Sequence, residues 1–205
     1  MANTDFDYKD LTKEKNLWDI YIVSRRIPSS RFNVLTTLIV FFALVTNSWL
    51  TVQPINETID LVRKLSDAGL TTSLNTIGLL LAGFTIFATV SQPSLSIRMG
   101  EIINRDSGLS YLKHNYFIFL RVFIYYLVFS VFCLLIVMFG HKGGIMSLLV
   151  SCSPYPDNVK YTVVKISYVL LFTGYYFLIM QLKSFIFNIY HAVMTSLRWK
   201  AEGYE

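Results

Sequence analysis

The chain has 205 residues, 54% of them hydrophobic, a mean hydropathy of +0.49 and a formal net charge of +5. The apolar residues form four blocks of about 20, long enough to cross a ~30 Å hydrocarbon layer, and helices of soluble proteins rarely stay apolar on all sides over that length. We therefore expect an integral membrane protein. The positive charge needs no nucleic acid to explain it, because cationic flanks beside an anionic leaflet suffice.

The predicted architecture is all-α, a polytopic bundle of four transmembrane helices with cytoplasmic extensions at both ends. Residues 1–31 form an N-terminal segment, residues 32–182 the transmembrane domain and residues 183–205 a helical C-terminal extension. No cleavable signal peptide is recognised, so we expect the first span to be an uncleaved anchor. The spans are predicted at about 32–52, 70–90, 117–139 and 159–180.

The N-terminal segment is polar, but an apolar pattern runs from Leu11 to Ile22. It predicts a short amphipathic helix that lies on the inner leaflet or grips a partner. Pro28 breaks the segment, and Ser29 or Ser30 is placed to cap the first membrane helix. The cations expected at headgroup level are Arg25, Arg26 and Arg31.

The segment between the first two spans carries apolar residues at helical spacing from Pro54 to Gly69. Pro favours a helix start and Gly a C-terminal cap. We predict a short amphipathic helix on the outer membrane–water interface, which either packs on its own bundle or reports on the state of the outer leaflet.

The second span is rich in small residues, which let helices approach closely, and its threonines can form hydrogen bonds across an interface. This pattern indicates either tight packing within one bundle or a subunit interface. The candidate residues for an oligomer interface are Gly78, Ala82, Gly83 and Thr85.

The loop at residues 92–116 follows Pro93, which is expected to end or kink the second span. It is more apolar than a free linker needs, so we expect it to pack on its own bundle or on a partner. After the fourth span a helical apolar stripe continues into residues 183–205, with one face free for contacts. The candidate partner-binding residues in the cytoplasmic parts are Trp18, Arg25, Arg26, Arg98, Arg105 and Arg198.

Two charges fall within the spans, Arg121 in the third and Lys165 in the fourth. Each lies close to a span end, so the plainer expectation is that both snorkel to the headgroups, and the alternative is a pore-lining or partner-binding role. No Asp or Glu lies in a span, which argues against a carboxylate-based proton relay.

Other reactive side chains are scattered. His114, His141 and His191 show no metal-ligand spacing, and Cys133 and Cys152 are too far apart along the helix axis for a disulfide. No nucleophile elbow or phosphate-binding loop is present. We therefore predict neither an enzyme nor a cofactor or metal site.

Positive charge divides unevenly between the two sides of the predicted bundle. Twelve cations flank one side and four flank the other, which places both termini and the middle loop in the cytoplasm by the positive-inside rule. The minority side carries Arg63, Lys64, Lys142 and Lys160.

The second span reads LLLAGFTIFAT from Leu79 to Thr89, followed by Ser91, Gln92 and Pro93. With a polar N-terminal segment, four spans and a charged C-terminal helix, the chain resembles the membrane subunits of the bacterial Kiwa anti-phage family. The resemblance implies an inner-membrane homo-oligomer, with a tetramer expected, that detects phage infection at the envelope. It also implies a cytosolic DNA-binding partner that blocks phage replication, with no nucleic acid bound by this chain itself.

Two functions follow as hypotheses. The first is a membrane sensor or scaffold that anchors or activates a cytosolic protein effector. The second is an oligomeric channel or pore-forming membrane effector, motivated by Arg121, Lys165 and the small-residue helix. A small transporter is a weaker idea, because the paired broken helices that mark a midplane site are missing.

Overall fold

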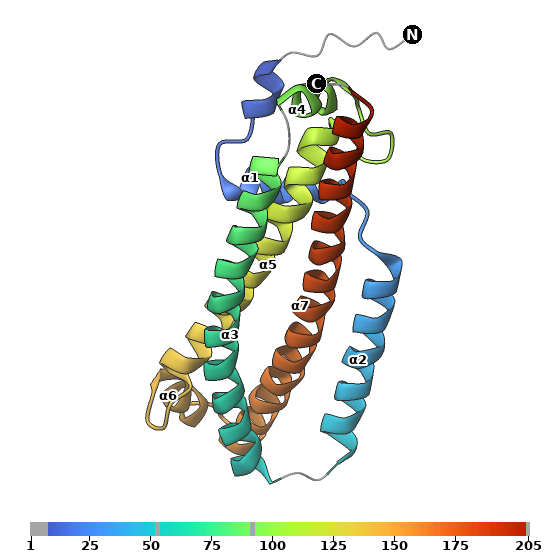
Figure 1. The fold of residues 1–205 in the computed structure, drawn as a ribbon. Helices are drawn as coiled ribbons and strands as arrows, with labels where there is room; N and C mark the ends of the chain where they lie inside the picture. The colour runs from blue at the N-terminus through green and yellow to red at the C-terminus, as the bar shows by residue number, and fades with distance from the viewer. Residues whose placement is uncertain (1–7, 52–53, 91–92, 204–205) are drawn as a thin grey trace. The chain divides into compact units, whose positions relative to one another are not determined.

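The computed structural model describes residues 8–51, 54–90 and 93–203. These residues form a short 3-10 helix, η1, and seven α-helices, and the regular structure among them includes no strand (Figure 1). The helices are α1 (Leu17–Ser24), α2 (Arg31–Leu50), α3 (Ile55–Val90), α4 (Pro93–Glu101), α5 (Tyr111–Phe139), α6 (Ile145–Ser151) and α7 (Pro156–Ala201), and η1 spans Tyr8–Thr12.

Four of these helices are long and apolar enough to cross a membrane, namely α2, α3, α5 and α7. The prediction of an all-α protein with four transmembrane-type helices is confirmed, and the chain is a membrane protein by this criterion. The helix α7 continues without a break to Ala201, beyond the predicted end of the fourth span.

The predicted interfacial helix that ends at Gly69 is wrong. That segment is the first part of α3, a single helix of 36 residues, or about 54 Å at 1.5 Å per residue. Gly69 lies within this helix, where a Cβ would stand 2.8 Å from Sγ of Cys133 and 2.9 Å from the hydroxyl of Tyr175. The glycine therefore serves close helix packing rather than a helix end.

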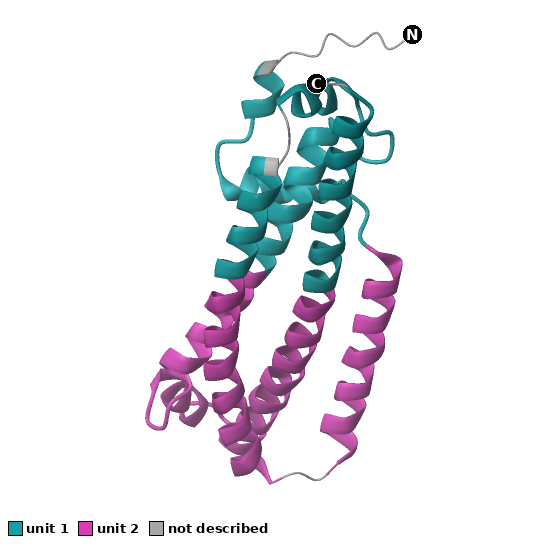
Figure 2. Cartoon of the chain, in the orientation of Figure 1, with its two compact units in different colours: residues 1–29, 78–125, 181–205 teal, residues 30–77, 126–180 magenta. Residues whose placement is uncertain are grey.

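The chain divides into two compact units, coloured separately in Figure 2. Unit 1 comprises residues 1–29, 78–125 and 181–205, and unit 2 comprises residues 30–77 and 126–180. Residues of α3, α5 and α7 contribute to both units.

Unit 1 is held by two apolar clusters. Ile27, Leu109 and Phe117 form the first, against which Ile20 and Val23 of α1 pack. Aromatic rings form the second, in which the buried Phe119 of α5 lies 4.8 Å from Phe87 and 5.3 Å from Phe185, centroid to centroid. The first cluster places the N-terminal segment against α5, so the segment is part of the folded unit rather than a free arm.

In unit 2, α5 and α7 approach closely at Gly174, where a Cβ would fall on the ring of Phe129. Tyr126 of α5 donates a hydrogen bond to the carbonyl of Leu178 at 3.1 Å. The helix α2 begins after Ser30, the predicted cap position, although the Ser30 side chain makes no capping hydrogen bond. Asn33 of α2 donates to the carbonyl of Met180 at 3.1 Å, which joins α2 to α7 within this unit.

Candidate functional site

The segment that precedes α1 is joined to the start of α5 by an ion pair in unit 1. Nζ of Lys113 lies 2.8 and 2.7 Å from the two carboxylate oxygens of Glu14. Both side chains are only 12% exposed, so this pair is shielded from water and is worth more than a surface pair. At the start of α1 the side chain of Asn16 accepts from the backbone N–H of Asp19 at 2.8 Å, a regular N-terminal cap.

Arg121 of α5 fixes the other end of α1. Its side chain is 8% exposed, and Nη1 donates to the carbonyls of Ser24 at 3.1 Å and Ile27 at 2.8 Å. Carbonyls at the end of a helix lack partners within it, and a cation is favoured there. The expectation that Arg121 snorkels to the headgroups is therefore wrong, because its guanidinium is bound within the protein as a cap for α1.

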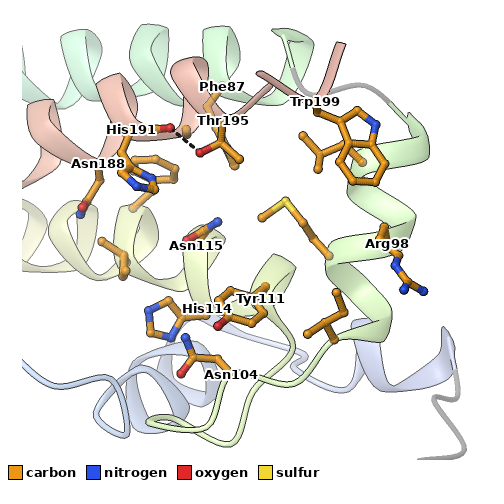
Figure 3. A pocket seen from close by; sticks show the side chains of 16 residues that line it. Phe87, Arg98, Asn104, Tyr111, His114, Asn115, Asn188, His191, Thr195 and Trp199 are labelled. Atoms are coloured by element: carbon orange, nitrogen blue, oxygen red, sulfur yellow. Dashed lines mark hydrogen bonds between the residues drawn. The ribbon is translucent and has the colours of Figure 1, made fainter. Parts of the chain in front are cut away.

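Unit 1 also contains a cavity of about 350 Å³ bounded by α4, α5 and α7 (Figure 3). Its walls combine aromatic and aliphatic residues with amide, imidazole and hydroxyl groups, an arrangement typical of ligand sites. Among the described residues that line it there is no carboxylate. The polar and aromatic lining residues labelled in Figure 3 are Phe87, Arg98, Asn104, Tyr111, His114, Asn115, Asn188, His191, Thr195 and Trp199.

Two carboxamides face this cavity from different helices, Asn115 from α5 and Asn188 from α7. Neither makes a hydrogen bond or ion pair with any residue that the structure describes, although both are partly buried. Half-buried amides normally find a partner, so these two can each donate and accept a bond with a molecule in the cavity. No pattern in the sequence marks these two residues, because a single asparagine near a span end carries no spacing signal.

His114 lines the same cavity, three residues before the apolar span of residues 117–139 begins. Nδ1 of His114 lies 2.9 Å from Oγ of Ser107, which joins the loop before α5 to that helix. The imidazole offers the cavity a ring nitrogen that can form a hydrogen bond.

All six candidate partner-binding residues belong to unit 1 and are exposed. Trp18 of α1 is 66% exposed. Arg98 forms an ion pair with Glu101 at 3.0 Å and Arg198 with Glu202 at 2.7 Å, both within one helix or its end. Such exposed pairs are weak, so these guanidinium groups stay available to another molecule. The remaining members of the set, also exposed, are Arg25, Arg26 and Arg105.

The candidate oligomer residues do not share one environment. Gly78, Ala82 and Thr85 of α3 are exposed, and a Cβ at Gly78 would meet nothing within 4 Å. Gly83 is buried, and a Cβ there would lie 2.7 Å from Cδ1 of Ile189 and 3.1 Å from the ring of Phe185. Gly83 therefore belongs to the packing of α3 on α7 within unit 1 and must be removed from the predicted interface.

Lys165 of α7 is 4% exposed and lies in unit 2. Its ammonium is 4.1 Å from the ring centroid of Tyr161 and 5.7 Å from that of Trp49 in α2, distances at which a cation is attracted to an aromatic face. Among the described residues it has no carboxylate partner. The expectation of snorkelling is wrong here as well, because the faces of the two aromatic rings stabilise the ammonium group inside the protein.

The histidines and cysteines do not gather into a metal site in the described part of the chain. Both cysteines are free, Cys133 buried and Cys152 exposed, as the geometric argument against a disulfide predicted.

Comparisons with protein-family models, with curated proteins and with solved structures find no match to this chain.

Proposed function

We propose that this chain is a membrane-embedded sensor and scaffold that anchors a cytosolic effector protein through unit 1, as a subunit of an inner-membrane anti-phage complex of the Kiwa type. The observation that carries the proposal is the far end of α7. Residues 181–201 continue the helix for about 30 Å after the predicted span. Their exposed side chains include a run of large apolar residues, namely Ile186, Phe187, Tyr190, Met194 and Leu197.

This part of unit 1 has the composition of a protein-binding surface. Exposed apolar and aromatic anchors with arginines nearby are the residues that dominate binding at protein interfaces. Phe187 and Trp18 are more than 60% exposed, and Arg198 lies one turn or so beyond Met194 on the same helix. A large cytosolic protein would cover these side chains, whereas lipid would have to accommodate the charged groups among them.

The distribution of positive charge supports a cytoplasmic location for unit 1. Most of the twelve cations on the richer side belong to it, and cytoplasmic flanks of membrane helices are those enriched in Lys and Arg. On this basis we propose that both termini lie in the cytoplasm.

The test is a pull-down of the tagged full-length protein from its native host in mild detergent, followed by the mass of the intact complex. The proposal expects a stoichiometric cytosolic protein, lost in Phe187→Glu and retained in the control variant Tyr155→Glu, which changes a similarly exposed aromatic residue of unit 2. A wild-type preparation without any cytosolic companion, even when the neighbouring gene is co-expressed, would count decisively against it.

A second candidate function is an oligomeric channel, and the exposed face of α3 favours it. Gly78, Ala82, Thr85 and Thr89 recur at intervals of four, three and four residues, so they lie on one face, and all four are exposed. Small and hydroxyl-bearing residues on a membrane helix favour close contact with another helix. A homo-oligomer without a cytosolic companion that conducts ions across a planar bilayer would favour the channel.

A further inference from the structure

Unit 2 contains a cavity of about 700 Å³ bounded by α3, α5, α6 and α7. Its walls are apolar along α5 from Phe132 to Phe139, a length of about 10 Å. The facing wall is formed by α7, and the aliphatic and aromatic residues that line the cavity include Phe132, Leu135, Ile136, Val163 and Val164. The space is therefore shaped for a hydrocarbon chain rather than for a polar molecule.

Charged residues line the same cavity near the start of α7. Nε of Arg63 donates to the carbonyl of Gly140 at 2.8 Å and Nη1 lies 3.3 Å from Asp60, so the guanidinium keeps further N–H groups for another acceptor. Lys160 is half-buried, and its ammonium has no hydrogen bond or ion pair with any described residue. Asp157 is exposed and is the one carboxylate among the described residues of the lining, and Asp60 outside the lining pairs with Arg63. Lys160 is therefore the cation that no described carboxylate pairs.

The short helix α6 indicates where the cavity lies with respect to a membrane. Met146 and Val150 line the cavity, whereas Ile145, Leu148 and Leu149 are each more than half exposed. A helix with apolar residues on its outer side, just after His141 and the charged Lys142, is suited to the membrane–water interface. The mouth of the cavity is then at the level of the lipid headgroups.

We propose that this cavity binds one anionic phospholipid, with an acyl chain along the apolar walls of α5 and α7 and the phosphodiester between Arg63 and Lys160. Guanidinium and ammonium groups are the usual ligands of phosphate, and pairs of cations between membrane helices select anionic headgroups. A water-soluble phosphate would satisfy the cations but would leave the apolar walls uncovered. The inference requires only that the chain lies in a membrane and is independent of the proposed partner.

The first experiment measures the thermal stability of the full-length protein in mild detergent with added lipid. Phosphatidylglycerol should raise Tm by about 5 °C more than phosphatidylcholine, as expected for a ligand well above its Kd. Glycerol phosphate, which carries at least as much negative charge but has no acyl chains, should have no effect. Equal stabilisation by the two lipids, or full stabilisation by glycerol phosphate alone, would overturn the proposal.

Matched variants identify the site. Lys160→Gln should abolish the preference for phosphatidylglycerol, and retention of the lipid in native mass spectrometry should fall about tenfold. Lys142→Gln removes an exposed cation close to α6 that does not line the cavity, and it should leave the preference intact. If the Lys160→Gln variant keeps the preference for phosphatidylglycerol, the assignment of this cavity as the lipid site is refuted.

A third variant separates charge from shape. Val164→Trp places a bulky indole among the apolar walls, where the acyl chain would lie, but keeps both cations. It should also lose the response to phosphatidylglycerol while its elution volume in gel filtration stays that of the wild type. A normal response in this variant would show that the lipid binds elsewhere. Should Val164→Trp fail to fold, the outcome with Lys160→Gln still decides the question, because that change lies at the edge of the cavity.

Discussion

Arg121→Met should release the N-terminal segment from unit 1 while the rest of the chain stays folded. Methionine keeps most of the length of the side chain and removes the donor that binds the carbonyls of Ser24 and Ile27. A hydrogen bond from a charged donor contributes about 1.5–3 kcal/mol, so two bonds give roughly 3–6 kcal/mol. The wild-type side chain also carries a cost, because its charge is buried and its Nε has no acceptor among the described residues. Removal of this cost in Arg121→Met offsets part of the lost hydrogen-bond energy. We expect a net loss of about 3 kcal/mol in the stability of the docked segment.

The assay is hydrogen exchange of the peptide that covers residues 17–27. Its amides include those of Arg25, Arg26 and Ile27, which are bonded within α1 and the turn that follows. Exchange through local opening reports the open population, and 3 kcal/mol corresponds to a rise of roughly 150-fold. Arg105→Gln, which removes an exposed cation of the same unit, should leave this peptide unchanged. An unchanged rate in Arg121→Met, or an equal rise in every helix, would refute the idea of a local latch.

Two further substitutions test the packing of unit 2. Gly174→Ala places a methyl group against the ring of Phe129, so thermal denaturation should show a loss of roughly 1–3 kcal/mol, and a wild-type Tm would contradict the close approach of α5 and α7. Lys165→Leu removes a buried ammonium that has aromatic neighbours but no carboxylate in the described chain, so Tm should stay unchanged or rise. A large fall in Tm would mean that the charge is needed for folding.

The four long helices could be predicted because hydropathy measures the transfer of side chains from water into an apolar medium. The same transfer stabilises such helices in a membrane. The length of α3 could not be predicted. A proline at one end and a glycine 15 residues later suggest a separate helix, but Gly69 permits close contact with Cys133 and Tyr175 inside a continuous one. Local signals of helix ends are therefore ambiguous where a neighbouring helix supplies another reason for a glycine.

The roles of the two buried cations, Arg121 and Lys165, could not be predicted from the sequence for a related reason. Position along a span suggests snorkelling, whereas the structure offers Arg121 two carbonyls more than 90 residues away and Lys165 the rings of Tyr161 and Trp49. Both cavities are likewise formed by segments distant in sequence. Arg98, His114 and His191 line the cavity of unit 1 from three different helices, and no spacing in the chain relates them.

The glycines of α3 allow packing within one chain to be separated from packing between chains. Gly83→Leu places its side chain against Ile189 and Phe185, so it should lower the stability of the monomer by roughly 1–3 kcal/mol or more. Gly78→Leu enters open space and should leave the folded monomer intact, apart from a small gain in helix propensity. If the exposed face of α3 is a subunit interface, Gly78→Leu alone reduces the mass of the detergent-solubilised complex, because the bulky side chain keeps the helices apart. A complex of wild-type mass with Gly78→Leu would exclude this face from the assembly, and the exposed surfaces of α2 and α7 would be the next to test.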